Sequence, residues 1–133
     1  ADDPGVDSGL MIAQYTAAGI VSELKRLAAP ASVDSIPTSA MQEDHVSMGW
    51  HAARKLRRAL DGLTRVLAVE LTAAARGIEL RGEGSSPVSG RVIAVLRDTV
   101  PGGGPDRHLA PELDAAARFL ESECFADILK EFA

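Results

Sequence analysis

Apolar residues recur at helical spacing through most of this chain. In the first segment they fall three, four and seven positions apart, the pattern of a helix with one apolar side. They are Leu10, Ala13, Ala17, Ile20, Val21, Leu24, Leu27 and Ala28. Pro30 cannot continue a helix, so we predict that this helix ends just before it. Polar residues such as Gln14, Glu23 and Lys25 interrupt the apolar run, and we therefore expect a helix buried in protein and no membrane partner.

A second and much longer helical pattern extends from Val46 to Gly77. Its apolar residues alternate in steps of three and four, as in the seam of a bundle helix. They are Ala53, Leu56, Leu60, Leu63, Leu67, Leu71 and Ala74. A helix of this length, about 45 Å, cannot bury its seam against one short neighbour. We therefore expect partner helices from other copies of the chain or from a missing part of the protein.

The same helix carries a cluster of basic residues within one or two turns. The cluster consists of Arg54, Lys55, Arg57 and Arg58. Such clusters are typical of a solvated or salt-bridged face, and this is the role we predict here.

Shorter helices are predicted in the last third of the chain. Ser86 is a predicted N-cap, because Pro87 follows it at the first helical position. The helix that it opens has an inward side made of Val88, Val92, Val95, Leu96 and Val100. The sequence Pro-Gly-Gly-Gly-Pro at 101–105 cannot be helical, and two further helices are predicted over 110–120 and 124–132. No segment has the alternation of a strand, so the predicted class is all-α, a long-helix bundle.

These patterns divide the chain into two predicted parts. Residues 1–81 hold the central-bundle helices and a polar loop over 30–49, and residues 82–133 form a carboxy-terminal helical segment. The 133 residues carry a net charge of −5 without a basic block, which argues against nucleic acid as a partner. The single cysteine, Cys124, fits a reducing compartment and offers no spacing for a metal site. We expect its thiol to be buried or half-buried.

The loop over 30–49 is the richest stretch in polar groups. It has neither helical nor strand periodicity, and its turn-forming residues include Asp34, Ser35 and Pro37. Ser39 and Gln42 have the spacing of a capping box for the long helix. The run Glu43-Asp44-His45 is too closely spaced to bind a metal from one helix face, so no metal is expected. From the residues alone, the commoner role for Glu43 or Asp44 is a charge at a helix N-terminus rather than a catalytic acid or base.

The segment from Pro30 to Asp44, with His45-Val46-Ser47-Met48-Gly49 after it, resembles the signature loop of the histidine and aromatic amino acid ammonia-lyases. It is most similar to the histidine-specific branch. The similarity continues through residues 67–75 and again through 106–112. One departure is Met41, where many relatives have asparagine.

The resemblance implies a catalytic and substrate-binding role for Glu43, near the imidazole of the substrate. A carboxylate there can accept a charge-assisted hydrogen bond from an imidazole N–H. Gln42 and Met11 match further substrate-binding positions, although Met11 is equally well explained as a core methionine. Asp44 and His45 are left as supporting residues.

The resemblance further implies that the chain is the carboxy-terminal part of a cytoplasmic, homotetrameric lyase of histidine catabolism. Its parent would eliminate ammonia from L-histidine to give trans-urocanate. These enzymes form a methylidene-imidazolone cofactor from an Ala-Ser-Gly triad, and the chain has no such triad. We therefore expect no cofactor in this chain and an inactive isolated fragment, with the missing amino-terminal part and other copies of the chain as partners. The start at Ala1, without methionine, agrees with a piece cut from a longer polypeptide.

Two alternatives stay open at this point. Within the same family, the chain could be a fragment of a tyrosine or phenylalanine ammonia-lyase or aminomutase. From a different class, it could be a non-catalytic helical interaction protein that has lost its catalytic half. The run Gln42-Glu43-Asp44-His45 favours the histidine-specific branch, because the phenylalanine-specific branch has Asn-Gln-Asp-Val in that region.

Overall fold

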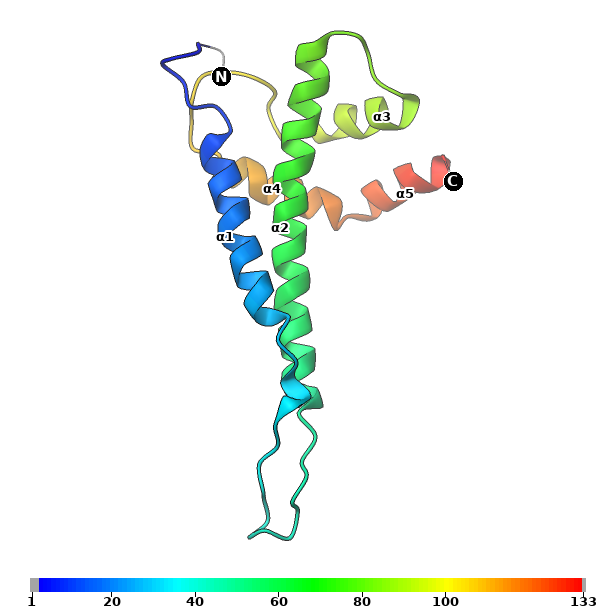
Figure 1. Ribbon diagram of the computed structural model, residues 1–133. Coiled ribbons are helices and arrows are strands. Elements are labelled where there is room, and N and C mark those ends of the chain that lie inside the picture. The colour runs from blue at the N-terminus through cyan, green and yellow to red at the C-terminus, as the bar shows by residue number, and fades with distance from the viewer. Residues whose placement is uncertain (1–2, 133) are drawn as a thin grey trace.

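The long second helix forms the axis of the molecule. The computed structural model describes residues 3–132. In it, α2 (Gly49–Arg81) spans most of the fold, and α1 (Met11–Leu27) lies beside it and runs in the opposite direction (Figure 1). The connection between them begins with a short 3-10 turn, η1 (Ala31–Val33), and projects beyond the first turn of α2.

Three shorter helices gather around the carboxy-terminal half of α2. They are α3 (Pro87–Leu96), α4 (Ala110–Leu120) and α5 (Glu123–Glu131). Ser86 is the N-cap of α3, because its hydroxyl accepts a hydrogen bond from the Ser89 N–H. Within residues 3–132 the only β features are two isolated bridges, so the predicted all-α class is confirmed.

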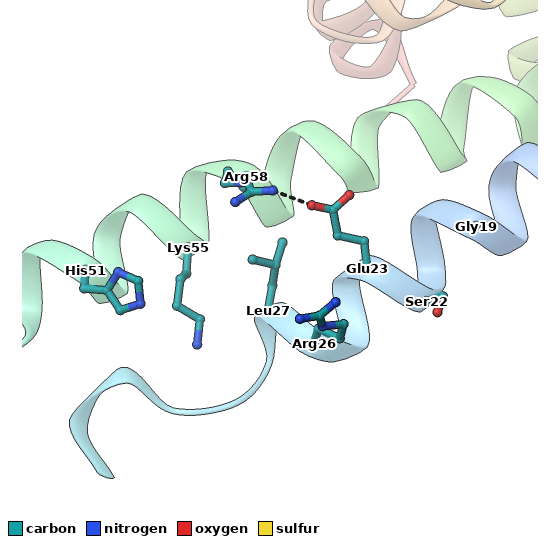
Figure 2. A pocket seen from close by; sticks show the side chains of 8 residues that line it. All are labelled: Gly19, Ser22, Glu23, Arg26, Leu27, His51, Lys55 and Arg58. Atoms are coloured by element: carbon teal, nitrogen blue, oxygen red, sulfur yellow. Dashed lines mark hydrogen bonds and ion pairs between the residues drawn. The ribbon is translucent and has the colours of Figure 1, made fainter. Parts of the chain in front are cut away.

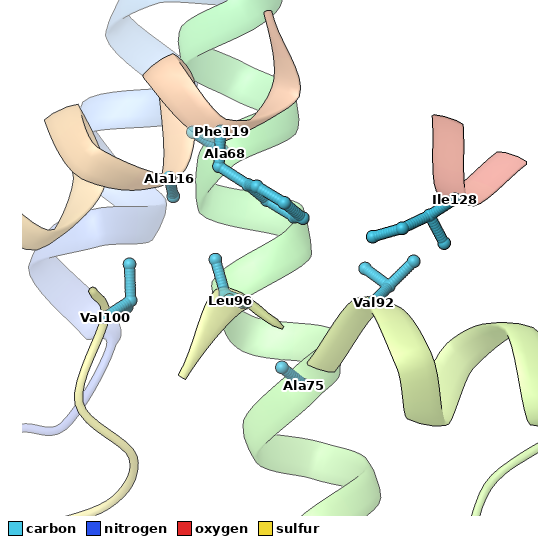
Figure 3. Close-up of a cluster of buried hydrophobic side chains, with 8 residues drawn as sticks. All are labelled: Ala68, Ala75, Val92, Leu96, Val100, Ala116, Phe119 and Ile128. Atoms are coloured by element: carbon cyan, nitrogen blue, oxygen red, sulfur yellow. The ribbon is translucent and has the colours of Figure 1, made fainter. Parts of the chain in front are cut away.

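The hydrophobic core lies where these helices meet. Small side chains on α2 face the larger ones of the other helices (Figure 3). The buried residues of this cluster are Ala68, Ala75, Val92, Leu96, Val100, Ala116, Phe119 and Ile128. Phe119 also packs edge-on against Phe125, with ring centroids 5.3 Å apart. The cluster contains residues from both sides of position 82. The division into 1–81 and 82–133 stays a prediction.

The helix ends differ from the predicted ones by a few residues. α2 begins at Gly49 rather than Val46 and continues to Arg81, where Gly82 in a left-handed conformation (φ +69°) ends it. α3 ends at Leu96, so Val100 is buried from a turn after the helix rather than from within it. Cys124 is exposed, and the expected burial of its thiol is wrong.

α1 and α2 approach each other closely at Gly62. A Cβ atom at this position would lie 2.9 Å from Leu24 Cδ2 and 3.3 Å from Ile20 Cγ2, so glycine permits the contact. Much of the predicted seam of α2 nevertheless stays uncovered. Leu56, Leu60, Leu63 and Leu67 are 40–61 % exposed.

A hydrogen-bonded clasp holds the start of α1 against the segment before α4. The Asp106 carboxylate accepts hydrogen bonds from the Ser8 and Gly9 N–H groups, at 2.6 and 2.7 Å. In return, the Asp106 N–H donates to Asp7 Oδ1 at 3.2 Å. This clasp fixes the first turn of α1, which carries Met11.

No helix in the part of the chain that the structure describes combines the length and the apolar character needed to cross a lipid bilayer.

Candidate functional site

The loop between α1 and α2 is held together by hydrogen bonds between its two arms. The extended backbone of Pro30 (φ −60°, ψ 138°) turns the chain away from α1. Near the base of the loop, the half-buried Ser35 hydroxyl accepts a hydrogen bond from the Val46 N–H at 2.8 Å and donates one to the Val46 carbonyl at 3.1 Å. This pair of bonds joins positions eleven residues apart and replaces a backbone ladder.

At its tip the loop closes into a tight turn between Thr38 and Glu43. The Thr38 N–H donates to the Glu43 carbonyl at 2.9 Å, and the Glu43 N–H donates to the Thr38 carbonyl at 3.2 Å. The three residues Ser39, Ala40 and Met41 all have positive φ, between +52° and +71°. This region of φ is unusual for residues other than glycine, and strained backbone of this kind is concentrated at functional sites.

This geometry contradicts the predicted capping box. Ser39 lies inside the turn, and α2 begins at Gly49 after Met48, which makes no side-chain cap hydrogen bond. Neither Glu43 nor Asp44 lies in the first turn of α2, so the role of a helix N-terminal charge is wrong for both. The spacing of Ser39 and Gln42 resembles a helix cap because the same residue types favour both helix N-caps and turns.

Glu43 is exposed and has one side-chain partner in its own turn. The Thr38 hydroxyl donates to Glu43 Oε2 at 3.2 Å. Gln42 is also exposed, and its N–H donates to the Ser39 carbonyl at 3.1 Å. The side chains of Glu43 and Gln42 are therefore exposed on a closed turn and lie outside the hydrophobic core.

Met11 lies far from these two residues. It is the first residue of α1 and is 50 % exposed, whereas the loop leaves from the other end of this helix (Figure 1). At 1.5 Å per residue, α1 is about 25 Å long. The structure thus brings Gln42 and Glu43 together and does not bring Met11 to them. If all three line one site, they come to it from different copies of the chain.

Thr38 was not singled out by the sequence. It lies in a stretch rich in turn-forming residues, and no periodic pattern indicates that it lies opposite Glu43. The contact depends on three successive left-handed residues, of which none is glycine, so the usual signal for such a turn is missing.

A groove between α1 and α2 lies elsewhere in the molecule (Figure 2). It has a volume of about 650 Å³ and contains none of Met11, Gln42 and Glu43. Arg58 reaches across it to Glu23 at 2.5 Å, and the Lys55 ammonium donates to the Ala29 carbonyl. Two members of the predicted basic cluster therefore bind α1 and the start of the loop, as expected for a salt-bridged face.

Comparison with known proteins identifies the family. The family model for aromatic amino acid lyases matches residues 1–98. The chain is 67 % identical over 122 residues to the histidine ammonia-lyase of Streptomyces avermitilis. The match covers 90 % of this chain and 24 % of the relative. It is 51 % identical over 122 residues to the histidine ammonia-lyase of Bradyrhizobium diazoefficiens, with 91 % and 24 % covered. The chain spans about a quarter of the length of these relatives.

Solved structures share the fold. The crystal structure of histidine ammonia-lyase from Trypanosoma cruzi superposes with a TM-score of 0.93 at 39 % identity, over 98 % of this chain and 26 % of that one. Tyrosine aminomutase from Streptomyces globisporus gives a TM-score of 0.89 at 37 % identity, over 97 % and 25 %. The helical arrangement and the sequence agree, and the chain belongs to the aromatic amino acid lyase family.

Proposed function

We propose that this chain supplies part of the active site of a histidine ammonia-lyase, which eliminates ammonia from L-histidine to give trans-urocanate. One observation carries the proposal. The Glu43 carboxylate is exposed on a turn that two backbone hydrogen bonds close, well outside the core of its own chain. A carboxylate displayed in this way is ready to accept a hydrogen bond from an imidazole N–H of a substrate that is held by other parts of the assembly.

Sequence identity supports histidine as the substrate. Relatives named histidine ammonia-lyase reach 67 % identity over 122 residues. The loop of this chain also offers a carboxyl acceptor at position 43, which suits an imidazole N–H better than a phenyl ring. The fragment of a tyrosine or phenylalanine enzyme is therefore the less favoured alternative.

The reactive centre of the proposed enzyme lies outside this chain. Members of the family are expected to use a methylidene-imidazolone formed from an Ala-Ser-Gly triad, and no triad of this kind occurs in the 133 residues. The residues present therefore do not form this group. In the proposed enzyme they bind and orient the substrate, and the isolated chain is expected to be inactive.

The exposed seam of α2 and the separation of Met11 from Glu43 support a composite site. We propose that several copies of the parent assemble as a homotetramer in the cytoplasm, with Met11 of one copy and the Glu43 turn of another facing the same substrate. One copy cannot provide both residues to the same site, because the length of α1 separates Met11 from the loop that carries Glu43.

A chimeric enzyme tests the role of Glu43. In the full-length Streptomyces avermitilis enzyme, this chain replaces the segment that it matches. Formation of urocanate from histidine is then followed by absorbance. Glu43→Gln keeps the shape of the side chain and removes its charge, so we expect kcat/KM for histidine to fall at least about 30-fold.

Glu121→Gln is the matched control, because Glu121 is exposed at the end of α4, away from the loop. We expect this variant to retain the activity of the unmodified chimera. Retention of activity by Glu43→Gln as well would refute the proposed imidazole contact.

A further inference from the structure

We propose that Thr38 is a positioning residue for Glu43, and that its hydroxyl sets the orientation in which the carboxylate meets the substrate. The inference rests on the proposed function of Glu43 and extends it to a residue of the opposite arm of the turn. The supporting contact is the 3.2 Å hydrogen bond from the Thr38 hydroxyl to Glu43 Oε2.

The backbone places the two side chains together. Thr38 and Glu43 form an isolated antiparallel bridge and exchange both of their backbone hydrogen bonds. Residues paired in this way have their side chains on the same face, with Cβ atoms about 5 Å apart. The bridge therefore brings the Thr38 hydroxyl within reach of the Glu43 carboxylate.

The strained turn keeps this pairing in register. The Thr38 carbonyl accepts hydrogen bonds from the N–H groups of both Met41 and Glu43, at 3.0 and 3.2 Å. Three left-handed residues, Ser39, Ala40 and Met41, lie between the bridge partners. Such a conformation persists only where its surroundings determine it, so the turn has little freedom to slide Glu43 relative to Thr38.

The hydrogen bond also gives the two oxygens of the Glu43 carboxylate different roles. Thr38 donates to Oε2, and in the part of the chain that the structure describes no hydrogen bond to Oε1 is present. Oε1 can thus accept the imidazole N–H while Oε2 is held. Threonine is suited to this task because its branched Cβ restricts χ1, so the hydroxyl is pre-oriented.

The test uses the same chimera and a double-mutant cycle. Thr38→Val keeps the branched shape and removes the donor, and Thr38→Ser keeps the donor. We expect Thr38→Val to lower kcat/KM for histidine about 10-fold, as for the loss of one hydrogen bond to a charged group. Thr38→Ser is expected to stay within about 3-fold of the parent, because the donor is preserved.

The cycle separates action through Glu43 from a general effect on the loop. In the Glu43→Ala background, Thr38→Val should have almost no further effect, since the acceptor of the Thr38 hydroxyl is already absent. The split of each single effect between kcat and KM should be the same for Thr38→Val and Glu43→Gln. Thr16→Val is the control for the chemical change, because the Thr16 hydroxyl donates within α1 to the Ile12 carbonyl.

The possible failures are distinguishable. Full activity of Glu43→Gln would overturn the role of Glu43 and that of Thr38 with it. A strong effect of Glu43→Gln combined with an equal loss from Thr38→Val in both backgrounds would overturn only the positioning role. A Thr38→Ser variant as impaired as Thr38→Val would do the same.

Discussion

Arg97 binds several groups at once near the carboxy-terminal end of α2. Its guanidinium forms two hydrogen bonds with the Glu79 carboxylate, at 2.6 and 2.8 Å, and two more with the carbonyls of Val100 and Pro101. The hydrogen bonds from Arg97 lower the pKa of Glu79 below its ordinary value of 4.5. This residue pair therefore joins α2 to the turn that follows α3.

The stability that Glu79 provides should depend on pH. Because its pKa is lower in the folded chain, the contribution is complete above pH 4.5 and is lost as the pH falls through the folded value. We expect Glu79→Gln to reduce the free energy of unfolding by about 1 kcal/mol at pH 7 and to match the parent in stronger acid. Urea denaturation at several pH values measures this. Glu83→Gln is the control, because the exposed Glu83 and Arg81 lie 3.7 Å apart and should contribute almost nothing; equal effects would contradict the prediction.

Met41 occupies a backbone conformation that suits asparagine better. Its φ is +71°, where most side chains are disfavoured by about 1 kcal/mol and asparagine is tolerated. We expect Met41→Asn to stabilise the turn and to slow hydrogen exchange of the Glu43 amide about 5-fold. Met41→Ala should give no such protection, and an equal gain in both variants would point to removal of the exposed methionine instead. The sequence predicted a loop here, with Ser39 and Gln42 as a capping box of the long helix. It did not predict three left-handed residues, because none of them is a glycine.

At the scale of single helices, two glycines of α2 differ in their surroundings. A Cβ at Gly77 would meet no atom within 4 Å, whereas one at Gly62 would press on Leu24. Alanine in a helix is favoured over glycine by about 1 kcal/mol, so we expect Gly77→Ala to raise the free energy of unfolding by about that amount. Gly62→Ala should gain less or lose stability. Chemical denaturation of both variants measures the difference, and a larger gain at Gly62 would show that α1 and α2 are not packed this closely.

Helices were predictable because their signals are local. Periodic apolar residues located α1, α2 and α3, and Ser86 with Pro87 located the start of α3. The ends of α2 were less predictable, since Met48 makes no side-chain cap and Gly77 does not stop the helix. The approach of Leu24 to Gly62 and the clasp at Asp106 depend on distant segments, which no local pattern specifies.

At the scale of the whole molecule, the exposed seam of α2 predicts self-association. Its leucines form a contiguous apolar surface that monomers rarely leave in water. We expect light scattering to give a mass above that of one chain, rising with concentration, and Leu60→Lys to reduce it. Leu80→Lys should have no effect, because Leu80 is exposed on the same helix but lies outside the seam. A sharp monomer for the parent chain would contradict this expectation.

The clasp at Asp106 has a consequence for the order of assembly during synthesis. It joins Asp106 to residues 97 and 98 positions earlier, so its closure is opposed by the entropy of a long loop. Only residues 28–48 separate α1 from α2, so these two helices can pair as soon as both have left the ribosome. The first turn of α1 waits for a segment that is made much later. The end of α1 that carries Met11 is therefore translated long before the segment that secures it.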